Sequence, residues 1–213
     1  MLTVHHLGIS QSDRIIWLCE ELEIPYELKI YARDPVTRLA PAEYKALHPL
    51  GTAPVITDGD LVLAESGAII EYIIGKYGNG RLALTAKDPG FADYLFWFHC
   101  ANGTLMSAEM LRMFAFVFEA QADNPVLQSV IDRGAKTFDL LEERLGKVPY
   151  LAGDSFTAAD IITFFPLTTM RAFAPRDLSP YPNIRAYLKR VGARPAYQRA
   201  MAKGDPGLPL MLE

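Results

Sequence analysis

The first third of the chain alternates between short apolar runs and stretches that carry apolar residues at helical spacing. Residues 2–7 and 26–31 are apolar runs typical of strands, and residues 12–23 between them follow the helical period. Two strands joined by a helix within about 30 residues predict a parallel pair with a right-handed crossover. A second, short helix is expected over residues 42–47.

A β-hairpin is predicted next, because residues 55–56 and 61–63 form two short apolar runs around Asp58-Gly59. Glycine accepts the positive φ that a tight turn requires. Pro54 opens the first run, as suits a residue that cannot donate a hydrogen bond to a neighbouring strand. Residues 65–75 then return to the helical period. The pattern predicts an α/β domain with the element order βαβ-α-ββα.

The rest of the chain has the periodicity of helices alone. Three glycines within residues 75–80 disfavour continued helix, so residues 78–87 are interpreted as a linker. Strands followed only by helices predict two packed domains, residues 1–77 and an all-α domain over residues 88–213. Its helices are expected at residues 89–118, 124–145, 157–172, 182–191 and 194–203.

A structural motif marks the start of the third of these helices. Thr157 is followed three residues later by Asp160, the spacing of a capping box. In this motif each side chain bonds the backbone of the other residue. We interpret the pair as a folding device and not as part of a catalytic site.

Composition narrows the classes of function. The chain has 213 residues, half of them hydrophobic, and a net charge of −4 with both signs mixed, which disfavours a nucleic-acid groove or a basic membrane-binding patch. It lacks a signal-peptide pattern and an apolar stretch long enough to span a bilayer. Cys19 and Cys100 are its only cysteines, which excludes a disulfide framework and a thiolate metal site. We expect a soluble cytoplasmic protein without a metal.

Candidate binding groups concentrate in residues 52–66. The extended backbone beside Pro54 offers peptide groups to a ligand. The start of the helix at Glu65-Ser66 offers unpaired N–H groups, which attract an anion. An extended peptide that ends in a carboxylate would suit this pair of features.

This stretch and the order of the elements resemble the cytosolic glutathione transferase family, over the whole chain. The resemblance implies a thioredoxin-like domain followed by an all-helical domain, with glutathione as co-substrate. It also implies a cis peptide bond before Pro54 and a homodimer, with Tyr94, Trp97 and Asn102 at the interface. The glutathione-binding residues that it implies are Ser12, Thr52, Ala53, Pro54, Val55, Glu65 and Ser66.

The loop of residues 8–14 resembles that of the serine-type, bacterial members of the family. This resemblance implies that Ser10 is the catalytic residue and donates a hydrogen bond to the glutathione thiolate. Two alternatives stay open. Ser12 could face the sulfur instead, or either serine could be structural, because Ser10 with Asp13 fits a capping box and Ser12 fits a plain N-cap.

The sequence departs from the family where the glycyl carboxylate of glutathione binds. Gly51 and Thr52 stand where many members have Lys or His. The residues that could replace that cation are His48, Lys45, Arg33 and Arg38. Cys19 lies on the apolar face of the first helix and is expected to be an inert core residue.

An apolar stripe in the long predicted helix has two interpretations. Met106, Met110, Met113 and Phe114 follow helical spacing, which is typical of a core. Methionine side chains also repack around varied shapes, and the resemblance implies a hydrophobic substrate pocket here. Some of these side chains could pack inward while others contact substrate.

The resulting hypothesis is a glutathione transferase that conjugates the glutathione thiolate to a small hydrophobic electrophile. A glutathione-dependent disulfide reductase or peroxidase, or a non-catalytic binding module of the same fold, stays open as an alternative. A Ser-His-Asp hydrolase is disfavoured because the chain has no Gly-x-Ser-x-Gly elbow. His5 and His6 are expected on opposite faces of the first strand.

Overall fold

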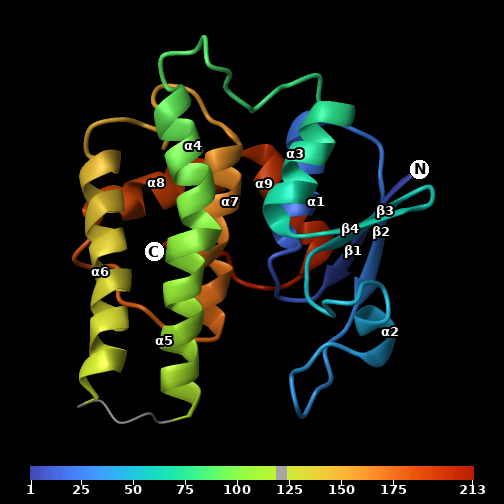
Figure 1. The fold of residues 1–213 in the computed structure, drawn as a ribbon, viewed down its shortest axis with the longest axis horizontal. Helices are drawn as coiled ribbons and strands as arrows, with labels where there is room; N and C mark the ends of the chain where they lie inside the picture. Colours follow the sequence, from blue (N-terminus) through green and yellow to red (C-terminus); the bar gives the residue numbers. More distant parts are fainter. Residues whose placement is uncertain (119–123) are drawn as a thin grey trace. The chain divides into compact units, whose positions relative to one another are not determined.

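The computed structural model of the protein describes residues 1–118 and 124–213. Contacts between Cα atoms divide the chain into two compact units. The first unit combines Met1–Ala83 with Ala193–Pro209, and the second combines Leu84–Gly192 with Leu210–Glu213. Figure 1 shows the sheet within the first unit and helices in both.

A four-stranded sheet in the order β2-β1-β3-β4 forms the first unit's frame. The central strand β1 (Leu2–Leu7) runs parallel to β2 (Glu27–Tyr31) and antiparallel to β3 (Val55–Asp58). β4 (Leu61–Ala64) pairs antiparallel with β3 through the predicted hairpin, and Gly59 takes a positive φ of 61° in the turn. The predicted parallel crossover and hairpin are both confirmed.

Four helices accompany this sheet. α1 and α3 lie side by side in Figure 1, and α9 packs against α1. The bounds of all four differ by one residue or two from the predicted ones because the terminal residues form caps and turns. The sequence analysis placed the last helix with the all-helical domain, whereas here it groups with the first unit. The four are α1 (Asp13–Leu22), α2 (Ala42–Lys45), α3 (Ser66–Lys76) and α9 (Pro195–Gly204).

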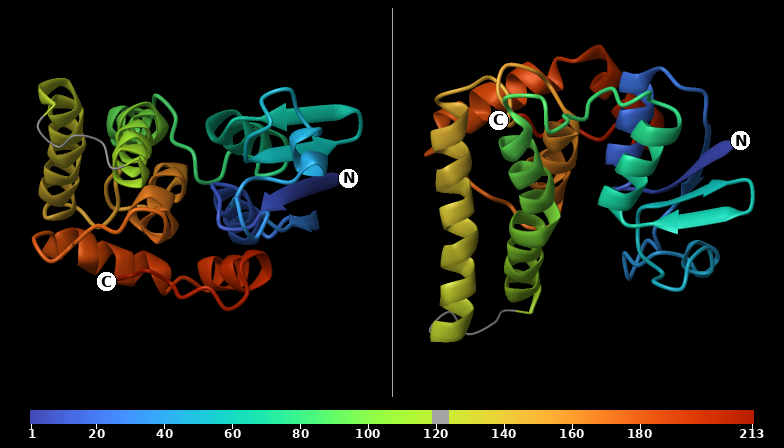
Figure 2. Two further views of the ribbon diagram at one scale, coloured as in Figure 1. Left: turned by 90° about the horizontal axis from the view of Figure 1, so that it is seen from below. Right: turned by 45° about the horizontal axis from the view of Figure 1, so that its top comes forward.

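The second unit is helical (Figure 2), and its elements are α4 (Phe91–Cys100), the π-helix η1 (Ala101–Met106), α5 (Ser107–Val117), α6 (Pro125–Leu145), α7 (Ala158–Leu167), the 3-10 turn η2 (Thr169–Ala172) and α8 (Pro182–Gly192). Helices α4 and α7 pack together, as do α5 and α6. The capping box at the start of α7 is confirmed, because an Asp160 carboxylate oxygen accepts from the Thr157 N–H at 2.8 Å.

The prediction of one regular helix over residues 89–118 is wrong. The helix begins at Phe91, and the π-helix η1 interrupts it. The Ser107 hydroxyl donates to the carbonyl of Asn102 at 2.9 Å, which accompanies the wider turn. Gly90 comes just before the helix, where a Cβ would lie 2.2 Å from the carbonyl oxygen of Ala152. Only glycine allows so close an approach.

The helix predicted over residues 157–172 also divides in two. α7 contains Pro166 and ends one residue later, after which Thr169–Ala172 form a 3-10 turn. Proline has no N–H to continue the helical ladder and restricts the residue before it. The Thr168 hydroxyl bonds the carbonyl of Phe164 at 2.9 Å, which satisfies one carbonyl at the break.

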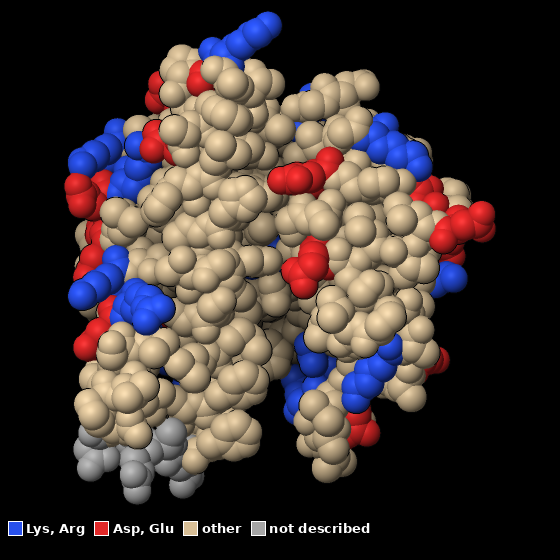
Figure 3. All heavy atoms as spheres, viewed as in Figure 1, with Lys and Arg blue, Asp and Glu red and all other residues tan. Residues whose placement is uncertain are grey.

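The surface carries both signs of charge. Lysines and arginines alternate with acidic residues on the face shown in Figure 3. In the described part of the chain, no helix combines the length and the apolar character that crossing a bilayer requires.

Candidate functional site

Ser10 lies in the loop between β1 and α1, and the protein encloses most of it, leaving 4% of the residue exposed. Its Oγ lies 2.7 Å from the Oγ of Ser12 and accepts from the Ser12 backbone N–H at 3.3 Å. Its carbonyl accepts from the N–H of Asp13 at 3.1 Å. Ser10 therefore supports the turn into α1 while its hydroxyl joins a side-chain network.

Ser12 occupies the N-cap position of α1, but its side chain makes no capping hydrogen bond. Its Oγ lies 2.8 Å from Nδ1 of His6, whose ring is fully buried. The interpretation of Ser12 as a side-chain N-cap is therefore wrong, because the imidazole engages the hydroxyl instead. Figure 1 shows the end of β1, from which this loop departs toward α1.

The other ring nitrogen of His6 faces a carboxylate from the far end of the chain. Nε2 lies 3.2 Å from Oδ2 of Asp205, at ion-pair distance and without the alignment of a good hydrogen bond. Oδ1 of Asp205 accepts from the N–H of Ile9 at 2.9 Å. The segment after α9 therefore fixes both His6 and the loop that carries Ser10.

The peptide bond between Ala53 and Pro54 is cis, as the resemblance implies. Val55, the next residue, begins β3, and Thr52 before them is exposed. Ala53 and Val55 belong to the cluster of apolar side chains that includes Leu7 at the end of β1. This packing holds residues 52–55 beside the strand end from which the Ser10 loop departs.

Glu65 and Ser66 begin α3. Glu65 is exposed at the N-cap with a φ of 74°, and Ser66 is 2% exposed. The buried guanidinium of Arg14 donates from Nη1 to Ser66 Oγ at 3.2 Å and to Gln11 Oε1 at 2.6 Å. Burial lowers the pKa of Arg14 to about 10. Arg14 thereby ties the first turn of α1 to the start of α3.

Arg33 is engaged with the Ser10 loop. Its guanidinium donates to the carbonyl of Gly8 at 2.7 Å and to that of Ile9 at 3.1 Å. Burial lowers its pKa, and the nearby Asp205 charge opposes that effect. Of the four basic residues considered for the glycyl carboxylate, this one therefore already has a structural task.

The other three basic residues differ in their surroundings. Nδ1 of His48 accepts from the N–H of Leu50 at 3.2 Å. Lys45 is exposed, and its Cβ and Cγ lie 3.7 Å from the point where a Cβ on Gly51 would be. Arg38 is exposed in the preceding loop. Lys45 is thus beside the chain that leads into residues 52–55.

The four residues of the predicted substrate pocket differ in burial. Met106 is buried in a cluster with Phe165, and Met110 and Met113 pack against that cluster while partly exposed. Phe114 is exposed and stacks on the ring of Phe118, the residue directly after α5. Met106 is therefore a core residue, whereas the other three present apolar surface.

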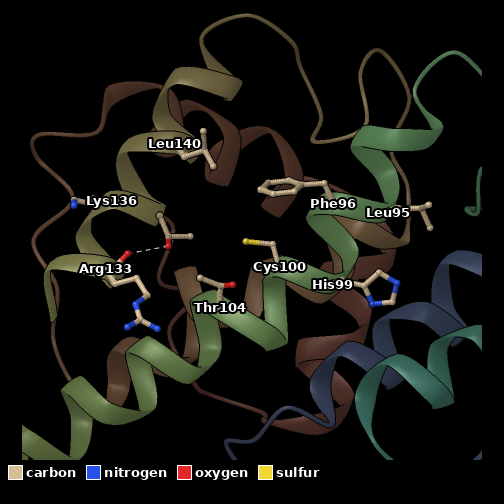
Figure 4. Close-up of a pocket in the computed structure, with 9 residues that line it drawn as sticks. Leu95, Phe96, His99, Cys100, Thr104, Arg133, Lys136 and Leu140 are labelled. Atoms are coloured by element: carbon tan, nitrogen blue, oxygen red, sulfur yellow. Dashed lines mark hydrogen bonds between the residues drawn. The ribbon is translucent and has the colours of Figure 1, made fainter. Parts of the chain in front are cut away.

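A separate cavity of about 690 Å³ lies among α4, η1 and α6. Figure 4 shows the Cys100 side chain directed toward α6, with Phe96 on one side of it. Burial raises the pKa of the Cys100 thiol, which disfavours a nucleophilic role. Burial also raises the pKa of Cys19 well above its ordinary value, as expected of an inert core thiol. Neither cysteine is a candidate nucleophile.

Two partners in the Ser10 network, His6 and Asp205, were not expected from the sequence. His6 was assigned only to a strand face, and Asp205 is 199 positions further along the chain. The sequence feature that bears on His6 is its alternation with His5 along the first strand, which predicts that the two side chains point to opposite faces. This prediction is confirmed, since His5 bonds Tyr31 and Thr57 while His6 bonds Ser12. No local pattern links Asp205 to the loop.

The chain matches two family descriptions: Glutathione S-transferase, N-terminal domain, over residues 10–74, and Glutathione S-transferase, C-terminal domain, over residues 105–195. It is 33% identical to Glutathione S-transferase 3 of Schizosaccharomyces pombe, with 95% of this chain and 88% of the relative covered. Glutathione S-transferase 1 of Saccharomyces cerevisiae is 29% identical, with 95% of each chain covered.

A crystal structure of a glutathione S-transferase from Actinobacillus pleuropneumoniae superposes with a TM-score of 0.88 at 36% identity, covering 98% of this chain and 94% of the other. The thioredoxin-like α/β fold with a helical partner domain is therefore shown. Both family matches, the curated relatives and this structure agree, and the chain belongs to the glutathione S-transferase family.

Proposed function

We propose that the protein binds glutathione on its first unit and conjugates the thiolate to a hydrophobic electrophile. The observation that carries this proposal is the Ser10 hydroxyl, held at the entrance to α1 in the unit that also contains the cis-Pro54 step and the start of α3. Oxidized glutathione in a structure of a glutathione transferase from Phanerochaete chrysosporium, and glutathione in one of a family member from Pseudomonas fluorescens, support the choice of ligand.

The ligand would lie extended. Residues 52–55 would pair with its cysteinyl backbone, and Glu65 with Ser66 would hold its γ-glutamyl end. The first N–H groups of α3 favour a carboxylate there. Lys45 is our candidate for the glycyl carboxylate, because its side chain lies beside Gly51.

The thiolate needs a moderate stabilisation. A free thiol has a pKa near about 8.5, and a useful thiolate at neutral pH needs a drop of about 1.5–2 units, or about 2–3 kcal/mol. A hydroxyl that donates to the charged sulfur supplies about 1.5–3 kcal/mol. The N-terminus of α1 adds a smaller favourable field. A Ser10 donor supplies a stabilisation of this size, which supports the serine-type mechanism that we propose.

Met110, Met113 and Phe114 remain our candidates for residues that receive a hydrophobic electrophile. All three present apolar surface, and methionine adapts to varied shapes. We also propose a homodimer. Tyr94 and Trp97, two of the interface residues first expected, are buried within the chain, and the exposed large apolar residues of α4 are Leu95 and Phe96.

Ser10→Ala is the direct test of the proposed function. We expect turnover with a chromogenic electrophile to fall at least about tenfold and the pKa of bound glutathione to rise by about one unit or more. Ser155→Ala, at an exposed turn, is the matched control and should change neither. A bound thiol that titrates identically in Ser10→Ala and wild type would contradict the assigned role.

A further inference from the structure

Four side chains form a continuous polar chain from Ser10 into the interior. The Oγ atoms of Ser10 and Ser12 are 2.7 Å apart, and either can be the donor. Ser12 Oγ is 2.8 Å from His6 Nδ1, and His6 Nε2 is 3.2 Å from Asp205 Oδ2. His6 and Ser12 are fully buried, Ser10 is 4% exposed, and the side chain of Asp205 is 8% exposed.

The direction of the hydroxyl protons follows from the proton on His6. With the ring neutral, its proton belongs on Nε2, where the carboxylate of Asp205 attracts it. Nδ1 then accepts from Ser12, and Ser12 in turn accepts from Ser10. In this state the Ser10 proton points away from a ligand, and Ser10 can only accept a hydrogen bond from the thiol.

A proton added to Nδ1 reverses every bond in the chain. The imidazolium donates to Ser12 Oγ, Ser12 donates to Ser10 Oγ, and Ser10 is able to donate outward to sulfur. The neutral arrangement therefore suits a thiol and the protonated arrangement suits a thiolate. Two arrangements of the same atoms match the two states of the ligand.

We propose that His6, acting through Ser12 and Ser10, takes up the proton that glutathione releases when its thiolate forms. This inference rests on the proposed function. The S–H bond breaks as an O–H bond forms on Ser10; the former Ser10 proton moves to Ser12, and the former Ser12 proton moves to Nδ1. The products are a thiolate that accepts from Ser10 and an imidazolium beside Asp205. After conjugation the proton returns by the same hydroxyls to the displaced anion or the carbanion formed.

The surroundings of the ring favour this role. The carboxylate of Asp205 faces Nε2 and stabilises the imidazolium, and the N–H of Ile9 fixes that carboxylate. The cation Arg33 lies near Asp205 and binds the Ser10 loop, so it moderates the carboxylate's field. Gly204 of α9 faces the ring, since a Cβ there would lie 3.2 Å from Nε2 of His6 and 2.8 Å from Cδ1 of Ile16 of α1. His6 and Asp205 are thus positioning residues that touch no substrate atom.

His6→Asn tests the relay, since the amide can occupy the Nδ1 position and bond Ser12 but cannot take up a proton. We expect the pKa of bound glutathione to rise by about one unit, so that the thiolate fraction and with it the conjugation rate at neutral pH fall about three- to fivefold. The rate should approach that of wild type at high pH, where solvent removes the proton. Affinity for S-methylglutathione, which has no thiol proton, should be unchanged.

His5→Asn is the matched control, because His5 is the neighbouring strand histidine and bonds Tyr31 and Thr57 instead. It should leave the pH profile of conjugation as in wild type. A pH profile for His6→Asn that is lowered equally at every pH would overturn the relay and indicate a structural role. An unchanged profile would overturn it as well.

Ser12→Ala and Asp205→Asn keep the proposal testable if His6→Asn does not fold. Ser12→Ala removes the hydroxyl that links Ser10 to His6, so it should shift the pH profile of conjugation as His6→Asn does. Asp205→Asn keeps an acceptor for Ile9 but removes the charge, so it should shift the profile by less. If wild type fails to bind S-methylglutathione, the proposed function itself fails, whereas normal binding with unshifted profiles in these variants rejects the relay alone.

Discussion

Two side chains of the candidate site depend on unusual backbone conformations directly before them. Ile9 precedes Ser10 with a φ of 52°, and Glu65 precedes Ser66 with a φ of 74°. A left-handed conformation costs a non-glycine residue about 1–2 kcal/mol, and more for a β-branched one. Ile9 is held there because its N–H bonds Asp205 and its carbonyl bonds Arg33.

The glycyl carboxylate gives a prediction about a single residue. Lys45→Ala should raise the Kd for glutathione by about fivefold, the effect of removing one exposed charge pair, with the loss smaller at high salt. Arg38→Ala is the control, because this exposed residue lies in the preceding loop and not beside Gly51. Calorimetric titration of both variants measures the difference. Equal affinities in the two variants would reject Lys45.

Side-chain roles at this scale were only partly readable from the sequence. Ser10 and Ser12 could be named because turn and cap patterns are local. Their separate roles could not be predicted, because these depend on residues outside the loop. His6 on β1 contacts Ser12, and Asp205, which follows α9, contacts His6. A hydroxyl at an N-cap position caps the helix by default, and the buried imidazole overrides that default here.

Elements with strong periodicity were predicted to within a few residues, whereas breaks inside them were not. The π-helix at Ala101–Met106 interrupts a pattern that reads as one helix. A side chain there bonds a carbonyl five residues earlier, Ser107 to Asn102, and apolar spacing does not record such a bond. The capping box of α7 was predicted because both of its members are close in sequence.

The start of α7 gives a prediction about pH. Complete burial raises the pKa of Asp160 to about 6, although Leu151, Thr157 and Tyr187 donate hydrogen bonds to it. A folded-state pKa above the ordinary value of 3.8 means that the folded protein binds this proton more tightly than the unfolded chain does. The tighter binding of this proton adds about 3 kcal/mol to the free energy of unfolding. This contribution is complete below about pH 4 and is lost as the pH rises through about 6.

Urea unfolding of wild type and Asp160→Asn over this pH range measures the effect. Because other groups titrate equally in both proteins, the difference between their free energies of unfolding isolates residue 160. That difference should shift by about 3 kcal/mol in favour of wild type as the pH falls from 7 to 4. A difference that stays constant with pH would show that Asp160 titrates alike in the folded and unfolded states.

At the scale of the whole molecule, the chain's last helix completes the unit that its first residues begin. Three acids near the end of α1, Glu20, Glu21 and Glu23, oppose the helix macrodipole and have no local explanation. The structure explains two of them: Glu20 pairs with Arg199 and Lys203, and Glu21 with Arg194. Acids without a local partner were thus a sign of a distant basic element.

The ion pair between Glu21 and Arg194 provides a test of how much the contact between the two ends of this unit stabilises it. Glu21 accepts two hydrogen bonds from Arg194, at 2.6 and 2.7 Å, and one from Trp17 at 3.0 Å. Glu21→Gln places an amide among these donors, so the free energy of unfolding should fall by about 2 kcal/mol. Glu23→Gln, two positions later and exposed, removes the same charge from the same turn and should change it by less than about 0.5 kcal/mol. Equal effects would mean that the helix field, and not the contact between residues 173 positions apart, sets the stability of this unit.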